Sequence, residues 1–310
     1  MSQTGANRIV SFLPAATEMI YALGLGDRLI GVTHECDYPP EAQHKPVVVR
    51  TVLPNGLTQR EIDDAVSARL KQGQSLYEAD AEALMRIGPD LIITQDLCSV
   101  CAPAGHEISQ LLKLLPAKPE ILWLAPKNLD GIFDNLREIA NVTGRTVKAE
   151  SLIAGLRRKL EHISKSVAAD GTRPRVFCME WLDPVYCSGH WVPEMVEWAG
   201  GIDALARAGS ESVRIAWRDV LEYAPELIVV APCGFDLERA AQAAEELLPA
   251  FPGWRDVPAV RSSRVFAVDA NSYFARPGPR VVDGTRLLAH LIHPGAVTWA
   301  GPPAYRRVAC

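Results

Sequence analysis

A chain of 310 residues, 48% of them hydrophobic, is long enough to form two lobes that each bury a core of their own. The net charge is −5, and no basic stripe or lysine-rich tail stands out, which argues against nucleic acid or an anionic membrane surface as the main partner. A small molecule is therefore the expected partner.

The first residues do not have the features of a secretory signal. Met1 to Gly5 include no basic residue, and the first expected strand already begins at Ile9. We therefore expect a cytoplasmic protein, or a periplasmic one if a leader has been removed. The seven cysteines, an odd number, are then expected to stay reduced and not to form a disulfide framework.

The first part of the chain alternates between strand and helix patterns. Short apolar runs that are typical of buried parallel strands occur at residues 9–12, 29–32, 91–94 and 121–124. An amphipathic stretch over residues 15–23 follows the first run, and Gly24 can end that helix. This βαβ pattern predicts an N-terminal α/β lobe over residues 1–125.

Residues 126–171 show helical patterns and no strand pattern. Asn128 can cap a first helix and Thr146 a second, longer one, whose apolar residues recur at helical spacing with charges between them. The alternatives are a plain surface helix and a connector, and its position between two strand arrays favours a helical connector.

A second array of strands and helices follows the connector. Apolar runs occur at residues 175–179, 227–230 and 265–268, and helical patterns at 193–199, 236–248 and 279–292. We predict a C-terminal α/β lobe over residues 172–297 and a tail over 298–310. The fold class is thus α/β, with two Rossmann-like lobes, parallel-type sheets, a helical backbone joining them and a ligand cleft between the lobes.

Cysteines follow several of the predicted strands, at the sheet edge where α/β proteins bind ligands. Cys98 and Cys101 form a CxxC pair that can chelate a metal or act as a dithiol, although cysteine is often only a small buried hydrophobic residue. With Cys36 and Cys233, four thiolates can hold zinc or an iron–sulfur cluster. The alternative function is therefore a cytosolic metal-binding or iron–sulfur redox protein or enzyme that uses these four cysteines.

Aromatic and charged side chains gather in the loops after the strands. Flat rings with a few polar groups suit a large planar or amphipathic ligand, and some of these rings can instead close the core. His34 and His190 can coordinate a metal in such a ligand, or can instead hydrogen-bond to a carboxylate such as Glu35 or Glu180. The candidate ligand-binding residues in these loops are Glu35, Tyr38, Glu180, Trp181, His190, Trp191, Phe235, Tyr273, Phe274 and Arg276.

Catalysis and nucleotide binding find less support in the sequence. Glu180 and Asp183 can form an acid/base pair, but no nucleophile, base and orienting group can be placed beside them. Neither a phosphate-binding G-x-x-x-x-G-K-[ST] motif nor a G-x-G-x-x-G after the first strand is present. We therefore predict a binding protein without catalytic residues.

Several motifs together resemble the cobalamin-binding branch of the periplasmic-binding proteins, over nearly the whole chain. These motifs are Ser11–Glu18, Cys36–Pro40, Gly88–Ile92, Gly200–Gly201 and Phe274–Arg280. Members of the wider group have two α/β lobes joined by a helical backbone, and they bind cobalamin, haem or ferric siderophores. The resemblance implies that a corrinoid cleft is lined by Ala15, Tyr38, Trp181, Trp217, Tyr273 and Arg276.

The resemblance also implies docking contacts with an ABC permease, through a surface glutamate seven residues before a proline in each lobe. Glu82 before Pro89 fits this pattern, whereas the position before Pro225 is Arg218. Residues 51–77 look like an insertion relative to the binding proteins of these importers. These differences favour a relative that binds a similar ligand without serving a transporter.

Overall fold

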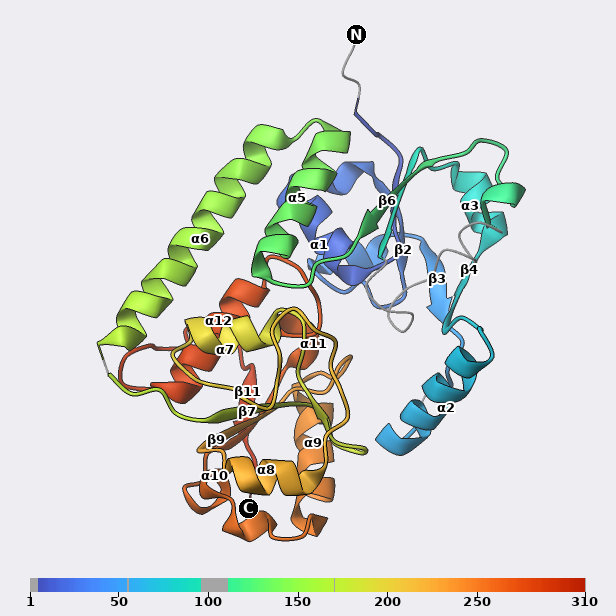
Figure 1. The fold of residues 1–310 in the computed structure, drawn as a ribbon. Coiled ribbons are helices and arrows are strands. Elements are labelled where there is room, and N and C mark those ends of the chain that lie inside the picture. Colours follow the sequence, from blue (N-terminus) through green and yellow to red (C-terminus); the bar gives the residue numbers. More distant parts are fainter. Residues whose placement is uncertain (1–4, 55, 96–110, 170, 310) are drawn as a thin grey trace. The chain divides into compact units, whose positions relative to one another are not determined.

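The computed structural model describes residues 5–54, 56–95, 111–169 and 171–309. The chain forms two compact units (Figure 1). Unit 1 contains residues 1–126 and 130–154, and unit 2 contains residues 127–129 and 155–310. The expected connector, residues 126–171, is divided between them, because helix α6 (Thr146–Ala168) continues through the boundary at residues 154 and 155.

Unit 1 is built on a six-stranded sheet with the order β4-β3-β2-β1-β5-β6. All neighbouring strands in it are parallel except β3 and β4, which are antiparallel. The strands are β1 (Ile9–Ser11), β2 (Leu29–Thr33), β3 (Val47–Thr51), β4 (Tyr77–Ala79), β5 (Leu91–Gln95) and β6 (Glu120–Leu124). The four predicted strands of this lobe are confirmed, and β3 and β4 are additions at one edge.

The helices of unit 1 whose bounds are described are α1 (Pro14–Ala22), α2 (Gln59–Lys71), α3 (Ala81–Ile87) and α5 (Leu129–Thr143), with short 3-10 turns at Gly26–Arg28 and Pro40–His44. Helix α1 contacts β1 and β2, and α3 contacts β2 and β3. One side of the core joins Phe12 from the end of β1, Val48 from β3 and Leu84 from α3. This packing positions the carboxyl ends of the strands.

The segment expected to be an insertion, residues 51–77, contains a capped helix. Thr58 and Glu61 form a capping box at the start of α2, in which each side chain accepts a hydrogen bond from the other's backbone N–H. Gln59 is the one buried residue of this helix, and its other residues are half-buried or exposed. The cap therefore stabilises an element that has little core of its own.

Unit 2 is built on a five-stranded sheet with the order β11-β10-β9-β7-β8. The three inner strands are parallel, and both edge strands are antiparallel to their neighbours. The strands are β7 (Val176–Trp181), β8 (Tyr186–Cys187), β9 (Leu227–Val230), β10 (Val265–Val268) and β11 (Tyr305–Arg307). Residues 298–310, expected to form a tail, thus contribute β11 to the sheet.

The helices of unit 2 cover its sheet and extend its core. They are α7 (Val192–Trp198), α8 (Trp217–Tyr223), α9 (Leu237–Leu247), α10 (Pro258–Arg261), α11 (Ala270–Tyr273) and α12 (Val281–Ile292), with 3-10 turns at Leu248–Ala250 and Trp254–Asp256. Helix α9 contacts β9, β10 and β11, and α12 contacts α7 and α11. The helices predicted over 193–199, 236–248 and 279–292 are confirmed. Among the described residues, none of the helices is both long and apolar enough to cross a membrane.

Candidate functional site

Glu180 lies near the carboxyl end of β7, at the sheet edge where ligands bind in parallel α/β folds. Its carboxylate accepts a hydrogen bond from the Ser212 hydroxyl at 2.7 Å and another from the backbone N–H of Gly189. Burial raises the pKa of Glu180, and these two hydrogen bonds oppose that rise. The side chain is thus held in one orientation by residues from two separate loops.

The loop that holds Glu180 requires glycine at position 189. A Cβ atom there would lie 2.5 Å from the Ser212 nitrogen and 2.6 Å from the Ser210 oxygen, both of which are backbone atoms. The next residue, His190, has a positive φ of 54°, and its N–H donates to the Ser210 carbonyl at 2.6 Å. Backbone contacts therefore fix the residues on either side of Gly189.

Two buried polar atoms beside Gly189 have no hydrogen-bond partner within the described part of the chain. They are the Ser188 hydroxyl oxygen and His190 Nε2. Burial lowers the pKa of His190, so the neutral imidazole is favoured. Because buried polar groups are normally paired, these atoms are suited to hydrogen-bond a ligand that carries polar groups.

An aromatic pair stands at the same end of the sheet as this polar cluster: Trp181 directly follows Glu180, and Phe235 follows β9. The rings of Trp181 and Phe235 meet edge to face, with their centroids 5.4 Å apart. Trp181 is half-buried, and its Nε1 donates to the Asp183 carbonyl oxygen at 3.1 Å. The ring is thereby fixed while part of its surface stays open to solvent, as a stacking surface for a planar ligand requires.

Trp181 is the more open member of this pair, since Phe235 is only 4% exposed, and three further predicted aromatic residues of this unit are also buried. Trp191 is 5% exposed and Phe274 is 2% exposed, and Trp191 Nε1 donates to the Phe274 carbonyl oxygen at 2.8 Å. Tyr273 and Arg276 are also buried, and Tyr273 meets the ring of Trp299 edge to face. In this structure Trp191 and Phe274 join two loops and support them from within.

Trp217 lies at the start of α8. Its ring stacks on Phe251 at 4.6 Å between centroids and contacts Trp254, and its Nε1 donates to the Pro252 carbonyl oxygen at 2.8 Å. These contacts join α8 to the segment that follows α9. Unlike Trp181 and Phe235, Trp217 therefore packs against rings for which no ligand role is predicted.

In unit 1, the predicted residues lie at the carboxyl ends of β1 and β2. Ala15 is buried in the first turn of α1, Glu35 is half-buried, and Tyr38 is 44% exposed. Of the three, Tyr38 offers the largest open surface.

The four cysteines proposed as metal ligands fall into three situations. Cys98 and Cys101 lie outside the described residues. Cys36 is buried with its sulfur 3.1 Å from the Thr17 hydroxyl and 3.4 Å from the Thr33 hydroxyl, and Cys233 is exposed. No cluster of three or more His, Cys, Asp or Glu suited to a metal occurs among the residues that the structure describes. The zinc or iron–sulfur site stays a prediction.

Ser212 and Asp203 are not among the residues predicted from the sequence. Ser212 lies in an irregular loop far from any predicted strand end, so only the fold brings it to Glu180. Asp203 follows the Gly200–Gly201 turn and accepts backbone hydrogen bonds from Cys178 and Leu205. A polar residue two positions after a glycine pair indicates a turn, and it does not indicate a buried carboxylate.

The amino-acid sequence is similar to one protein family and to several proteins of known function. The sequence model described as periplasmic binding protein matches residues 9–272. The vitamin B12-binding protein of Vibrio cholerae serotype O1 is 27% identical over 284 residues, covering 90% of this chain and 86% of that protein. The cobalamin-binding protein of Halobacterium salinarum is 23% identical over 292 residues, covering 92% and 69%.

Solved structures show the same fold. The crystal structure of the periplasmic vitamin B12-binding protein of Vibrio cholerae has a TM-score of 0.66 at 24% identity, covering 93% of this chain and 97% of that one. A periplasmic haem-binding protein of Pseudomonas aeruginosa has a TM-score of 0.73 at 20% identity, covering 98% and 99%. The two-lobed α/β fold predicted from the sequence is confirmed by these likenesses.

Proposed function

This chain belongs to the periplasmic binding protein family, and we propose that it binds a cobalamin-like corrinoid without changing it chemically. The observation that carries the proposal is the carboxyl edge of the unit 2 sheet. There, the fixed and partly open ring of Trp181 stands near a buried polar cluster with two unpaired atoms, Ser188 Oγ and His190 Nε2. A corrinoid presents a broad flat macrocycle and many polar side chains, so it matches both features.

The relatives support the corrinoid over other flat ligands. Those at 27% and 23% identity are a vitamin B12-binding and a cobalamin-binding protein, while a haem-binding protein shares the fold at 20% identity. In unit 1, Tyr38 is the residue that we propose for a ligand role, because it is 44% exposed at the carboxyl end of its own sheet. Glu180, with its raised pKa, would act as a polar anchor and not as a catalyst.

Titration with cyanocobalamin, followed by calorimetry and by the corrinoid absorption spectrum, tests the proposal. We expect saturable binding of one equivalent. Haemin and a ferric hydroxamate siderophore serve as competing arms. Saturable binding of either, together with no response to cyanocobalamin, would overturn the corrinoid assignment while leaving the fold family unaffected.

A tryptophan variant locates the binding surface. We expect Trp181→Ala to weaken cyanocobalamin binding by about tenfold or more, since it removes a large apolar contact and the edge-to-face pair with Phe235. Trp123→Ala is the matched control, because Trp123 lies on β6 and is 36% exposed. The two dissociation constants are compared by calorimetry. Equal affinities in the two variants would remove Trp181 from the site.

The permease contacts implied by the resemblance remain part of this proposal. Glu82 is exposed in the first turn of α3, and Arg218 is exposed in the first turn of α8, where it pairs with Asp219 at 3.5 Å. We propose that docking, if retained, uses the unit 1 glutamate alone, because a cation at 218 would repel permease arginines.

A further inference from the structure

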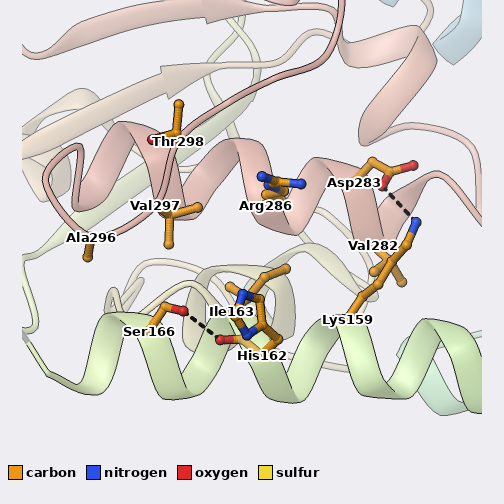
Figure 2. Close-up of a pocket in the computed structure, with 10 residues that line it drawn as sticks. All are labelled: Lys159, His162, Ile163, Ser166, Val282, Asp283, Arg286, Ala296, Val297 and Thr298. Atoms are coloured by element: carbon orange, nitrogen blue, oxygen red, sulfur yellow. Dashed lines mark hydrogen bonds and ion pairs between the residues drawn. The ribbon is translucent and has the colours of Figure 1, made fainter.

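A groove on unit 2 is separate from all the predicted ligand residues. It lies between α6, α12 and the segment that follows α12, and it has a volume of about 310 Å³ (Figure 2). That volume is at the lower end of the range for sites that hold small molecules. All of its residues belong to unit 2, so its shape depends on this unit alone.

The floor of the groove is apolar. Ile163 from α6, Val282 from α12 and Val297 from the following segment line it, and each is buried. An inorganic ion that keeps its water shell would gain nothing from such a floor, whereas an apolar group would be removed from water there. The floor therefore favours an occupant with an apolar portion.

The rim of the groove carries a positive charge that no acidic residue balances. Lys159 forms an ion pair with Asp283 at 3.4 Å (Figure 2). The remaining cation of the arginine and lysine residues that line the groove is Arg286. Within the described ranges, Arg286 has neither an ion pair nor a side-chain hydrogen bond. A guanidinium stays charged at every physiological pH and presents paired donors to a carboxylate or phosphate. The free charge therefore favours an anionic head group.

Further donors stand around the same opening. His162 on α6 offers an imidazole N–H, and Thr298 offers a hydroxyl from the opposite wall. Ser166 does not add a donor, because its hydroxyl already donates to the His162 carbonyl oxygen at 2.9 Å. The donors therefore come from both helices and from the segment after α12.

The wall formed by that segment is fixed in place. Val297 N–H donates to the His293 carbonyl at 3.1 Å, and a ring nitrogen of His290 lies 3.0 Å from the Val297 carbonyl oxygen. The other ring nitrogen of His290 is 3.0 Å from the Tyr305 hydroxyl on β11. A groove whose wall is anchored to the sheet does not need to be ordered when a ligand binds, which lowers the cost of binding.

We propose that this groove is a second ligand site, which takes a small organic anion with a carboxylate or phosphate head and a compact apolar body. The head group pairs with Arg286 and accepts from His162 and Thr298. The body covers Ile163, Val282 and Val297. None of these residues belongs to the proposed corrinoid site, so this site and the corrinoid site stand or fall separately.

Calorimetry and saturation-transfer NMR on the full chain test this site with three probes. Phenyl phosphate has both the charge and the ring, inorganic phosphate has only the charge, and benzyl alcohol has only the ring. We expect phenyl phosphate to bind saturably with a dissociation constant below about 1 mM. Inorganic phosphate and benzyl alcohol are expected to bind at least about tenfold more weakly. No saturation by phenyl phosphate up to about 10 mM would overturn the proposal. Equal affinity for inorganic phosphate or for benzyl alcohol would overturn the organic-anion class.

Two charge variants make the test specific. Arg286→Glu is expected to abolish phenyl phosphate binding, and the milder Arg286→Gln to weaken it by about tenfold. Arg158→Glu makes the same charge change on an exposed residue of α6 that does not line the groove, and it should bind as the wild type does. Equal loss in Arg158→Glu and Arg286→Glu would show a general charge effect and would refute the site. Unchanged circular dichroism in each variant establishes that it is folded.

Discussion

Replacing Gly284 with alanine is expected to destabilise the protein by about 2–3 kcal/mol, because the added methyl group has no room. A Cβ atom at this position would lie 2.3 Å from the backbone carbonyl oxygen of Tyr273 and 2.9 Å from the end of the Met195 side chain. The methionine can move, but the carbonyl belongs to α11 and cannot move without shifting that helix. The gain in helix propensity from glycine to alanine, about 1 kcal/mol, does not offset this clash.

Urea unfolding measures this effect against a second helical glycine. Gly155 lies in α6, and a Cβ there would meet only the end of the Arg158 side chain, at 4.0 Å. The same substitution at Gly155 is therefore expected to stabilise the protein by up to about 1 kcal/mol. A Gly284→Ala protein as stable as the wild type would show that α11 and α12 do not pack as closely as described. Because Tyr273 is a candidate ligand residue, the variant should also bind cyanocobalamin more weakly.

The stability of the protein is expected to fall as pH rises from 5.5 to 7.5, through Asp203. Burial raises the pKa of Asp203 from 3.8 to about 7, although hydrogen bonds from the N–H groups of Cys178, Leu205 and Ala206 oppose the rise. Below about pH 7 the native carboxyl holds a proton that the unfolded state has already lost. The free energy of unfolding therefore decreases with rising pH, by about 2 kcal/mol from this group. Above pH 7 the native carboxyl also ionises, and the decrease levels off.

Asp203→Asn removes this titration, and urea unfolding at several pH values shows its share. The slope is the readout and not the absolute stability, because an amide cannot accept both of the hydrogen bonds that Cys178 and Leu205 donate to the two carboxylate oxygens. Asp256→Asn makes the same change at an exposed carboxylate and should keep the wild-type slope. Equal slopes in the wild type and Asp203→Asn would contradict the assignment. Comparing slopes between proteins also cancels the contributions of Glu180, whose pKa is raised as well, and of His190, whose pKa is lowered.

Local sequence pattern predicted the candidate site in part. Strand ends identified Glu180 and Trp181, since a residue that follows a buried apolar run can be located from the run itself. The same reasoning gave no indication that Trp191 and Phe274 are enclosed, or that Trp217 stacks on Phe251. The local sequence around an aromatic loop residue does not differ between a ring that faces a ligand and a ring that packs on another ring. Burial depends on which loops meet, and that is a property of the fold.

By itself, the sequence determined the α/β class, most of the parallel strands (β1, β2, β5 and β6 in unit 1 and β7, β9 and β10 in unit 2) and the family, because each of these is encoded in contiguous residues. Tertiary structure decided which distant residues meet. Ser212 reaches Glu180 across 32 positions, and β11 pairs with β10 from a segment that looked like a tail. The groove beside Arg286 likewise joins residues of α6 and α12 that lie more than 100 positions apart. Such contacts cost loop-closure entropy that only the packed core as a whole offsets, so no local pattern specifies them.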